Sequence, residues 1–139
     1  RSVCWAFQFN RTLIMWLSFL AIFCGAGLGA LLRAGFNFLT VGAASVVPLG
    51  TLLANMVGGY LVGIAVAFFG SNPSLSPEWK LFVITGFLGG LTTFSSFSAE
   101  VVSFMQRGEF TWALGTALLH LVGSLALTFL GILTYQALK

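Results

Sequence analysis

Charged side chains are scarce in this sequence, and their scarcity excludes an ordinary water-soluble domain. Only 6% of the 139 residues are charged, whereas roughly a quarter are charged in soluble globular proteins. Apolar residues make up 58% of the chain, and the mean hydropathy is +1.02. A single domain of this length cannot hide so much apolar surface from water. We therefore predict that the chain is surrounded by a lipid bilayer.

Clusters of basic residues and of metal ligands are also missing. The six basic and three acidic residues are scattered along the chain, whereas nucleic-acid binding needs a clustered basic face, so no nucleic-acid partner is expected. Cys4 and Cys24 are the only cysteines, and we interpret them as packing residues with no disulfide and no metal site. The one histidine, His120, has no acid at helical spacing. An intramembrane enzyme, which would need a nucleophile–base pair or a metal cluster, is therefore not expected.

Long uncharged stretches predict an all-α membrane protein with four transmembrane helices. Each stretch is longer than the roughly 20 residues that a helix needs to cross the hydrocarbon core. Helices are expected because they satisfy every backbone polar group within their own segment. Polar residues predict loops at 71–78 and 106–109. The predicted spans are 12–38, 49–70, 81–99 and 110–138, and the first of them contains Arg33 near its end.

The residues before Met15 look out of place, and the loop charges are evenly balanced. We expect residues 1–14 to be a non-native or disordered extension and residues 15–139 to form the transmembrane domain. Counted from Met15, Lys80 and Lys139 lie on one side of the membrane, and Arg33 and Arg107 lie on the other. The positive-inside rule then gives no preferred orientation. A chain that inserts both ways can form an antiparallel dimer, which suits a unit too small to enclose a pore alone.

Glycine pairs at a spacing of four predict close contacts between helices. Lipid gives helices no hydrophobic reason to associate, so close backbone approach must supply the attraction. Such contacts can lie between subunits or within one subunit, and the sequence leaves both possibilities open. The pairs are Gly25 with Gly29, Gly59 with Gly63, and Gly86 with Gly90.

The third span contains a sequence that weakens a helix in the middle of the membrane. Two glycines, Gly89 and Gly90, are followed closely by Thr92 and Thr93. Unwound backbone is tolerated at that depth only if it is buried or faces a wet or ion-bearing cavity. Carbonyl groups released by such a break are good ligands for a hard cation.

Beyond this break, aromatic and hydroxyl side chains form two neighbouring stripes. Phe94 and Phe97 repeat at three residues, as do Ser95 and Ser98. Alternation of this kind is unusual for simple packing, although a core stripe is a fair alternative. Glu100 follows on the same helix, where it can accept hydrogen bonds from hydroxyl groups and orient them. The competing interpretation is that Glu100 is simply a carboxylate at the membrane interface.

Other polar groups at membrane depth are candidates for function, because burying them unpaired costs free energy. Arg33 is either a snorkelling interfacial arginine or a vestibule charge that concentrates anions. Asn55 can join two helices, or it can present two N–H donors to an anion. His120, Ser124 and Thr128 share one face of the fourth span, where hydrogen bonds between helices are the competing interpretation.

The deep polar groups are mainly weak donors, which favours a pathway for a small anion. They comprise an amide, several hydroxyl groups and the positive edges of phenylalanine rings. No lysine or arginine lies at the centre of a span. A fixed cation would hold a small anion too tightly, whereas conduction requires both entry and exit.

These motifs, taken in order, resemble the fluoride channel family called Fluc or CrcB over residues 15–139. The stretch in the third span is highly specific, and the others support it. The motifs are Gly29-x-x-x-Arg33, Gly50-Thr51-x-x-x-Asn55, Gly89-Gly90-Leu91-Thr92-Thr93-Phe94-Ser95-Ser96-Phe97-Ser98-x-Glu100 and Gly123-Ser124.

The resemblance implies an antiparallel, dual-topology homodimer in a bacterial inner membrane, with two fluoride pathways. Phe94 and Phe97 resemble the ring-edge residues that line each pathway, with Asn55 as a donor and Arg33 in the vestibule. Backbone carbonyls of Gly89 and Thr92, two from each subunit, would hold a structural sodium ion at the dimer centre. The polar track beside the rings would contain Ser95, Ser98, Glu100, Ser124 and Thr128.

Two other membrane functions compete with a fluoride channel. A small multidrug-resistance-type transporter is also a four-span, dual-topology dimer, but it would need a carboxylate in its first span. The acids here are Glu78, Glu100 and Glu109, and none lies in that span. A non-conducting assembly subunit could share the glycine contacts, but it would not need the broken third helix.

Overall fold

The computed structural model describes residues 2–42 and 45–139, with side chains described from residue 12, and every described element is helical. Four helical segments are long and apolar enough to cross a membrane, as predicted. Their bounds are Thr12–Thr40, Leu49–Ser71, Pro77–Gln106 and Phe110–Ala137. The side chain of Cys4 lies outside the described residues, and Cys24 is an exposed free thiol.

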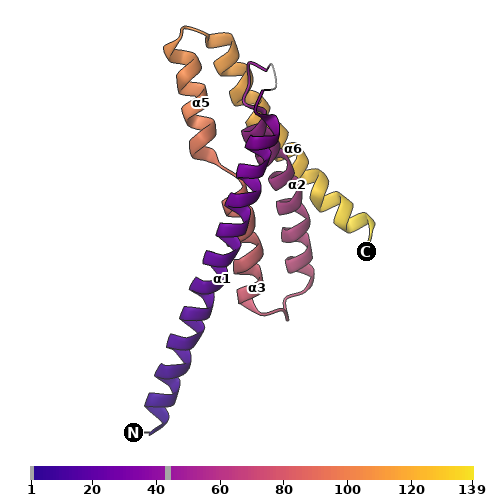
Figure 1. Ribbon diagram of the computed structural model, residues 1–139. Coiled ribbons are helices and arrows are strands. Elements are labelled where there is room, and N and C mark those ends of the chain that lie inside the picture. Colours follow the sequence, from indigo (N-terminus) through magenta and orange to yellow (C-terminus); the bar gives the residue numbers. More distant parts are fainter. Residues whose placement is uncertain (1, 43–44) are drawn as a thin grey trace.

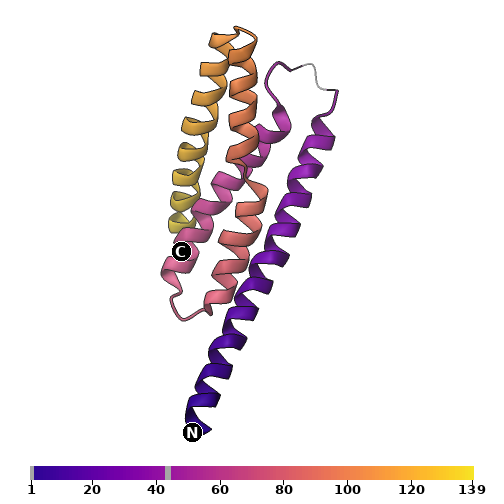
Figure 2. The same ribbon diagram turned by 90° about the vertical axis from the view of Figure 1, so that its left-hand side faces the viewer.

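The first span belongs to a longer helix, α1 (Ser2–Thr40), which extends well beyond the other helices at its N-terminal end (Figures 1 and 2). Most of the 1–14 segment lies in this helix, and the expectation that it is a separate extension stays a prediction. Beyond α1 the chain turns at Gly42, whose φ of +88° lies in the region that glycine adopts most readily.

The third span is longer than predicted and consists of several segments. A short helix α3 (Pro77–Lys80) leads into a π-helical stretch η1 (Leu81–Leu88), followed by α4 (Gly89–Leu91) and α5 (Phe94–Gln106). The span begins four residues earlier than predicted, because Pro77 is well suited to the first helical turn. It continues to Gln106 because the apolar pattern does not end at Glu100.

The helices α2 (Leu49–Ser71) and α6 (Phe110–Ala137) run side by side in the same direction (Figure 2). Asn55 lies opposite His120, and a Cβ atom at Gly59 would lie 3.1 Å from the carbonyl oxygen of Ser124. One turn later, Gly63 lies against the backbone of Thr128. Successive turns of α2 thus contact successive turns of α6, so the face of α6 that carries these polar residues packs against α2.

The paired glycines bring helices together within one subunit. Gly25 and Gly29 of α1 lie against the backbone of η1 and α4, and Gly86 lies against Gly25 in return. Of the two interpretations of the glycine pairs, packing inside the subunit is the one observed. The main cluster of buried apolar residues is correspondingly small and consists of Ala54, Ala65, Leu88 and Leu91.

Many large apolar side chains point away from this core. Phe23, Leu31 and Phe38 are each more than 70% exposed in the single chain. Such surfaces are incompatible with water but are ordinary for a helix that faces lipid or a partner helix.

We predict that an added methyl group destabilises the protein at a glycine in close contact with another helix, but not at a glycine on the open face of α1. In Gly29→Ala the new Cβ would collide with the backbone of Phe87 and Leu91, whereas Gly27 has no atom within 4 Å of that position. Overpacking costs roughly 1–3 kcal/mol, so Gly29→Ala should lower the thermal unfolding midpoint of the purified protein. Gly27→Ala is the matched control and should leave the midpoint unchanged or raise it, and equal losses in both variants would contradict the assigned contact.

Candidate functional site

The third span is broken at Thr92 and Thr93, near its middle. Thr92 (ψ 154°) and Thr93 (φ −148°, ψ 116°) are extended, between the end of α4 at Leu91 and the start of α5 at Phe94. Thr93 caps α5, since its hydroxyl oxygen accepts a hydrogen bond from the backbone N–H of Ser96 at 3.2 Å, and threonine is a favourable N-cap. The predicted interruption is therefore present.

The two glycines before the break are helical, and the interruption falls on the two threonines of the same predicted stretch. Gly89 and Gly90 belong to α4. A Cβ atom at Gly90 would collide with the backbone of Ala26 in α1. At Gly90 the absence of a side chain therefore permits packing, and the change in backbone direction falls on the threonines.

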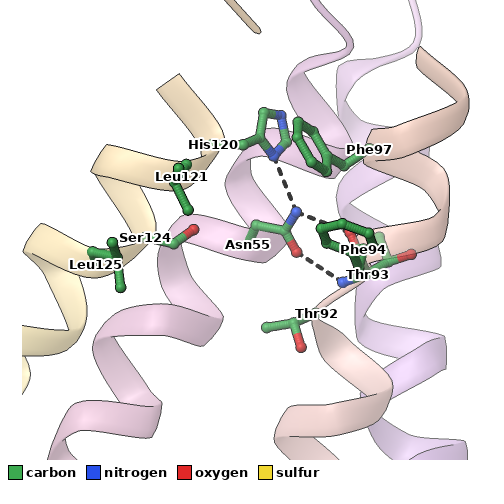
Figure 3. A pocket seen from close by; sticks show the side chains of 9 residues that line it. All are labelled: Asn55, Thr92, Thr93, Phe94, Phe97, His120, Leu121, Ser124 and Leu125. Atoms are coloured by element: carbon green, nitrogen blue, oxygen red, sulfur yellow. Dashed lines mark hydrogen bonds between the residues drawn. The ribbon is translucent and has the colours of Figure 1, made fainter. Parts of the chain in front are cut away.

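Asn55 of α2 holds the broken backbone in place. Its Oδ1 accepts a hydrogen bond from the backbone N–H of Thr93 at 2.8 Å, and its Nδ2 donates to the carbonyl oxygen of Thr93 at 3.1 Å (Figure 3). Asn55 is 9% exposed and Thr93 is 6% exposed. One amide side chain thus satisfies both backbone groups of a buried residue, which would otherwise be costly to leave unpaired.

The break changes the partners of two carbonyl groups. In an unbroken helix, the N–H of Thr93 would pair with the carbonyl of Gly89, and the N–H of Ser96 would pair with the carbonyl of Thr92. Here these N–H groups donate to Asn55 Oδ1 and to Thr93 Oγ1 instead. The carbonyls of Gly89 and Thr92 are consequently released from the regular helical pattern.

A row of three side-chain rings begins next to Asn55. Asn55 Nδ2 lies 3.1 Å from His120 Nδ1, and the imidazole stacks on Phe97 with 4.8 Å between ring centroids. Phe97 in turn meets Phe94 in an edge-on arrangement at 5.5 Å. Figure 3 shows the three rings together. Phe94 is 80% exposed, so the row of rings leads from the buried histidine to the outside of the subunit.

A cavity of about 280 Å³ lies beside these rings. Its walls come from α2, α6 and the two sides of the break, and they carry no charged side chain. The cavity brings together five of the predicted site residues. The complete lining is Asn55, Thr92, Thr93, Phe94, Phe97, His120, Leu121, Ser124 and Leu125 (Figure 3).

Glu100 does not line this cavity but is held by a residue that sequence reasoning did not assign to the site. Thr51 Oγ1 donates to Glu100 Oε1 at 2.5 Å. The other carboxylate oxygen, Oε2, is buried and has no hydrogen-bond partner among the described residues. The contact joins the first turn of α2 to α5, and the expectation that hydroxyl groups donate to Glu100 is met by Thr51.

The remaining predicted hydroxyl groups do not line the cavity and lie against other polar groups. Ser98 donates to the carbonyl of Phe94 at 2.8 Å, and Ser95 Oγ lies 3.2 Å from Thr93 Oγ1. The hydroxyl oxygen of Thr128 lies 3.0 Å from the carbonyl oxygen of Gly59 and 2.9 Å from that of Ser124. Arg33 is half-buried on α1, also outside the cavity lining.

Comparison with known proteins assigns the chain to a family. Residues 20–132 match the family described as CrcB-like protein, Camphor Resistance (CrcB). The chain belongs to the CrcB family. It is 83% identical over 125 residues to the fluoride-specific ion channel FluC of Polynucleobacter asymbioticus, covering 90% of this chain and all of the relative. The proteins of the same name from Burkholderia thailandensis and Pseudomonas putida are each 57% identical, covering 88% and 85% of this chain and 96% and 93% of their own.

Membership of the CrcB family fits a channel and not an enzyme, in agreement with the sequence analysis. Two features of the site were nevertheless missed from sequence. The role of Thr51 depends on the contact between α2 and α5, which the sequence does not show. The only sequence signal for Thr51 was its place in the Gly50–Asn55 motif. The stacking of His120 on Phe97 had no signal beyond the shared polar face of the fourth span.

We predict that the Thr51 hydroxyl group stabilises the fold through Glu100. Thr51→Val keeps the shape of the side chain but removes the donor to a half-buried carboxylate whose other oxygen is buried and has no partner among the described residues. An unpaired buried group costs about 1–3 kcal/mol, so Thr51→Val should lower the thermal unfolding midpoint, whereas Thr51→Ser retains a hydroxyl group and should lower it less. Equal midpoints for the valine and serine variants would contradict this role.

Proposed function

We propose that this protein is a fluoride-selective channel that lets fluoride leave the cell passively and so lowers its cytoplasmic concentration. The observation that carries the proposal is the cavity at the broken third helix, where amide, hydroxyl and ring groups meet without a charged side chain. The names of the FluC relatives support the choice of ion. Four apolar spans and this channel family support a location in the bacterial inner membrane.

Weak donors suit fluoride because the ion must exchange its water and still leave. The edges of Phe94 and Phe97 carry partial positive charge, and the Asn55 amide and Ser124 hydroxyl add hydrogen-bond donors. Together they can replace several waters around a compact anion, whereas a fixed ammonium or guanidinium group would retain it. We place Ser95, Ser98, Glu100 and Thr128 along the adjoining polar track and Arg33 in the vestibule. The polar track and the vestibule position are assigned by their match to the family motif.

The functional unit proposed here is an antiparallel homodimer with two pathways. The balanced loop charges permit both orientations in the membrane. The exposed ring of Phe94 (80%) lies at the outer end of the ring series, where a second subunit would complete the wall of the conduit. One chain encloses too little space for a continuous pore, so each pathway would lie along the contact between subunits.

A structural sodium ion at the dimer centre fits the donor set of the break. Hard cations prefer oxygen ligands, and the carbonyls of Gly89 and Thr92 have lost the N–H groups that would pair with them in a regular helix. Two such carbonyls from each subunit would give four oxygen ligands. The ion would add positive charge near the pathways and would fix the partners in register.

The competing functions lack a comparable observation. A small multidrug-resistance-type transporter needs a carboxylate in its first span, and Thr12–Thr40 contains none. A non-conducting assembly subunit would have no use for a broken helix whose backbone is held by a buried asparagine.

We predict that changes at the cavity reduce fluoride flux, and that the two phenylalanine changes leave assembly intact. Phe94→Ile, Phe97→Ile and Asn55→Asp should each lower fluoride efflux from loaded liposomes by roughly tenfold or more, because each removes a weak donor or adds a repelling charge. Size-exclusion chromatography should show an unchanged dimer for Phe94→Ile and Phe97→Ile, whereas Asn55→Asp also removes the donor to the Thr93 carbonyl and should lower stability.

The matched control is Phe110→Ile, an exposed ring at the start of α6 away from the cavity, which should conduct normally. Chloride efflux from the same liposomes measures selectivity. Normal fluoride flux in all three cavity variants would overturn the assigned pathway.

We also predict a dependence on sodium. Prolonged exchange into sodium-free buffer should cause a slow loss of fluoride efflux, because the ion would be buried between subunits. Re-addition of sodium should restore the flux, with potassium or N-methylglucamine at equal ionic strength as the control. Full activity after sodium removal, verified by elemental analysis, would refute the central ion.

A further inference from the structure

The Asn55 amide has no spare hydrogen for an anion in this structure. Its Oδ1 must face the backbone N–H of Thr93, since that group can only donate. The amide nitrogen then supplies one hydrogen to the Thr93 carbonyl and the other to His120 Nδ1. A fluoride ion that binds Asn55 must therefore displace one of these two acceptors.

The two acceptors differ in how easily they can be displaced. The Thr93 carbonyl is part of a two-point contact with a capped, buried backbone segment, so its loss would also free the neighbouring N–H. The contact with His120 is a single hydrogen bond between side chains on α2 and α6. The hydrogen given to His120 is therefore the one that an anion in the cavity can take with least disruption.

The same geometry fixes the protonation pattern of the imidazole. Because Asn55 Nδ2 can only donate, Nδ1 of His120 is the acceptor and the ring proton lies on Nε2. His120 is 4% exposed, and its Nε2 has no hydrogen-bond partner among the described residues. The imidazole is thus held by the amide on one side and by the ring of Phe97 on its face.

We propose that His120 is a positioning residue that occupies the second Asn55 hydrogen between ions and releases it to fluoride. This proposal rests on the proposed function and adds a reason why fluoride can bind Asn55 without being held too tightly to leave. A buried donor with no acceptor would bind an anion strongly, because binding would also relieve its desolvation cost. With His120 in place, fluoride exchanges one hydrogen bond for another and can leave again.

The test compares His120→Leu with His120→Asn in fluoride efflux assays over a range of fluoride concentrations. Leucine and asparagine have nearly the same shape and both remove the ring that stacks on Phe97, but only asparagine offers an acceptor near the position of Nδ1. His120→Leu should lower the half-saturating fluoride concentration at least about fivefold, since an unpaired buried donor is costly, and should lower the maximal rate. His120→Asn should resemble the wild type in half-saturation.

Equal half-saturation in the leucine and asparagine variants would overturn the role of His120, whether or not their maximal rates fall. The proposed function fails separately, if the wild-type protein does not conduct fluoride at all. Should the leucine variant not fold, ¹⁵N spectra of the histidine-labelled wild type give a second test. His120 is the only histidine, so fluoride should shift its Nδ1 signal towards that of a nitrogen without a hydrogen bond. Chloride should not do so, and an unmoved signal in fluoride would contradict the exchange.

Discussion

The rest of the site depends on the two hydrogen bonds between Asn55 and the backbone of Thr93. A helix cannot be interrupted in the middle of a membrane unless the freed backbone groups find partners inside the protein. Asn55 supplies both partners from a neighbouring helix, and this allows Thr92 and Thr93 to be extended. The released carbonyls, the start of α5 and the position of the phenylalanine rings all follow from that local solution.

Close packing of the helices places Asn55 where it can act. The contacts of Gly59 and Gly63 with Ser124 and Thr128 set the register between α2 and α6, and this register also puts His120 opposite Asn55. On the other side, Gly86 and Gly90 bring the first half of the third span against α1. Small residues, with little apolar burial, therefore determine where the few deep polar side chains meet.

The sequence predicted the features that are repeated or periodic, and it missed those that depend on register between helices. Hydropathy located the four spans, and the Gly–Thr stretch located the break to within a few residues. It could not tell that Gly90 serves contact with Ala26 while the threonines carry the break, because both roles favour small or weakly helical residues. The partnership of Thr51 with Glu100 joins residues 49 positions apart, and only the packed helices bring them together.

Pairing of the donors is the less obvious requirement for an anion pathway through a membrane protein. The hydroxyl groups of Ser98 and Thr128 lie within hydrogen-bonding distance of carbonyls, and both Asn55 hydrogens have acceptors. Donors left permanently unpaired would destabilise the empty protein and then hold the anion that relieved them. Donors with weak internal partners avoid both effects, since the anion replaces an existing hydrogen bond at little net cost. The same logic explains why a conduit for a small anion can lack lysine and arginine along its lining.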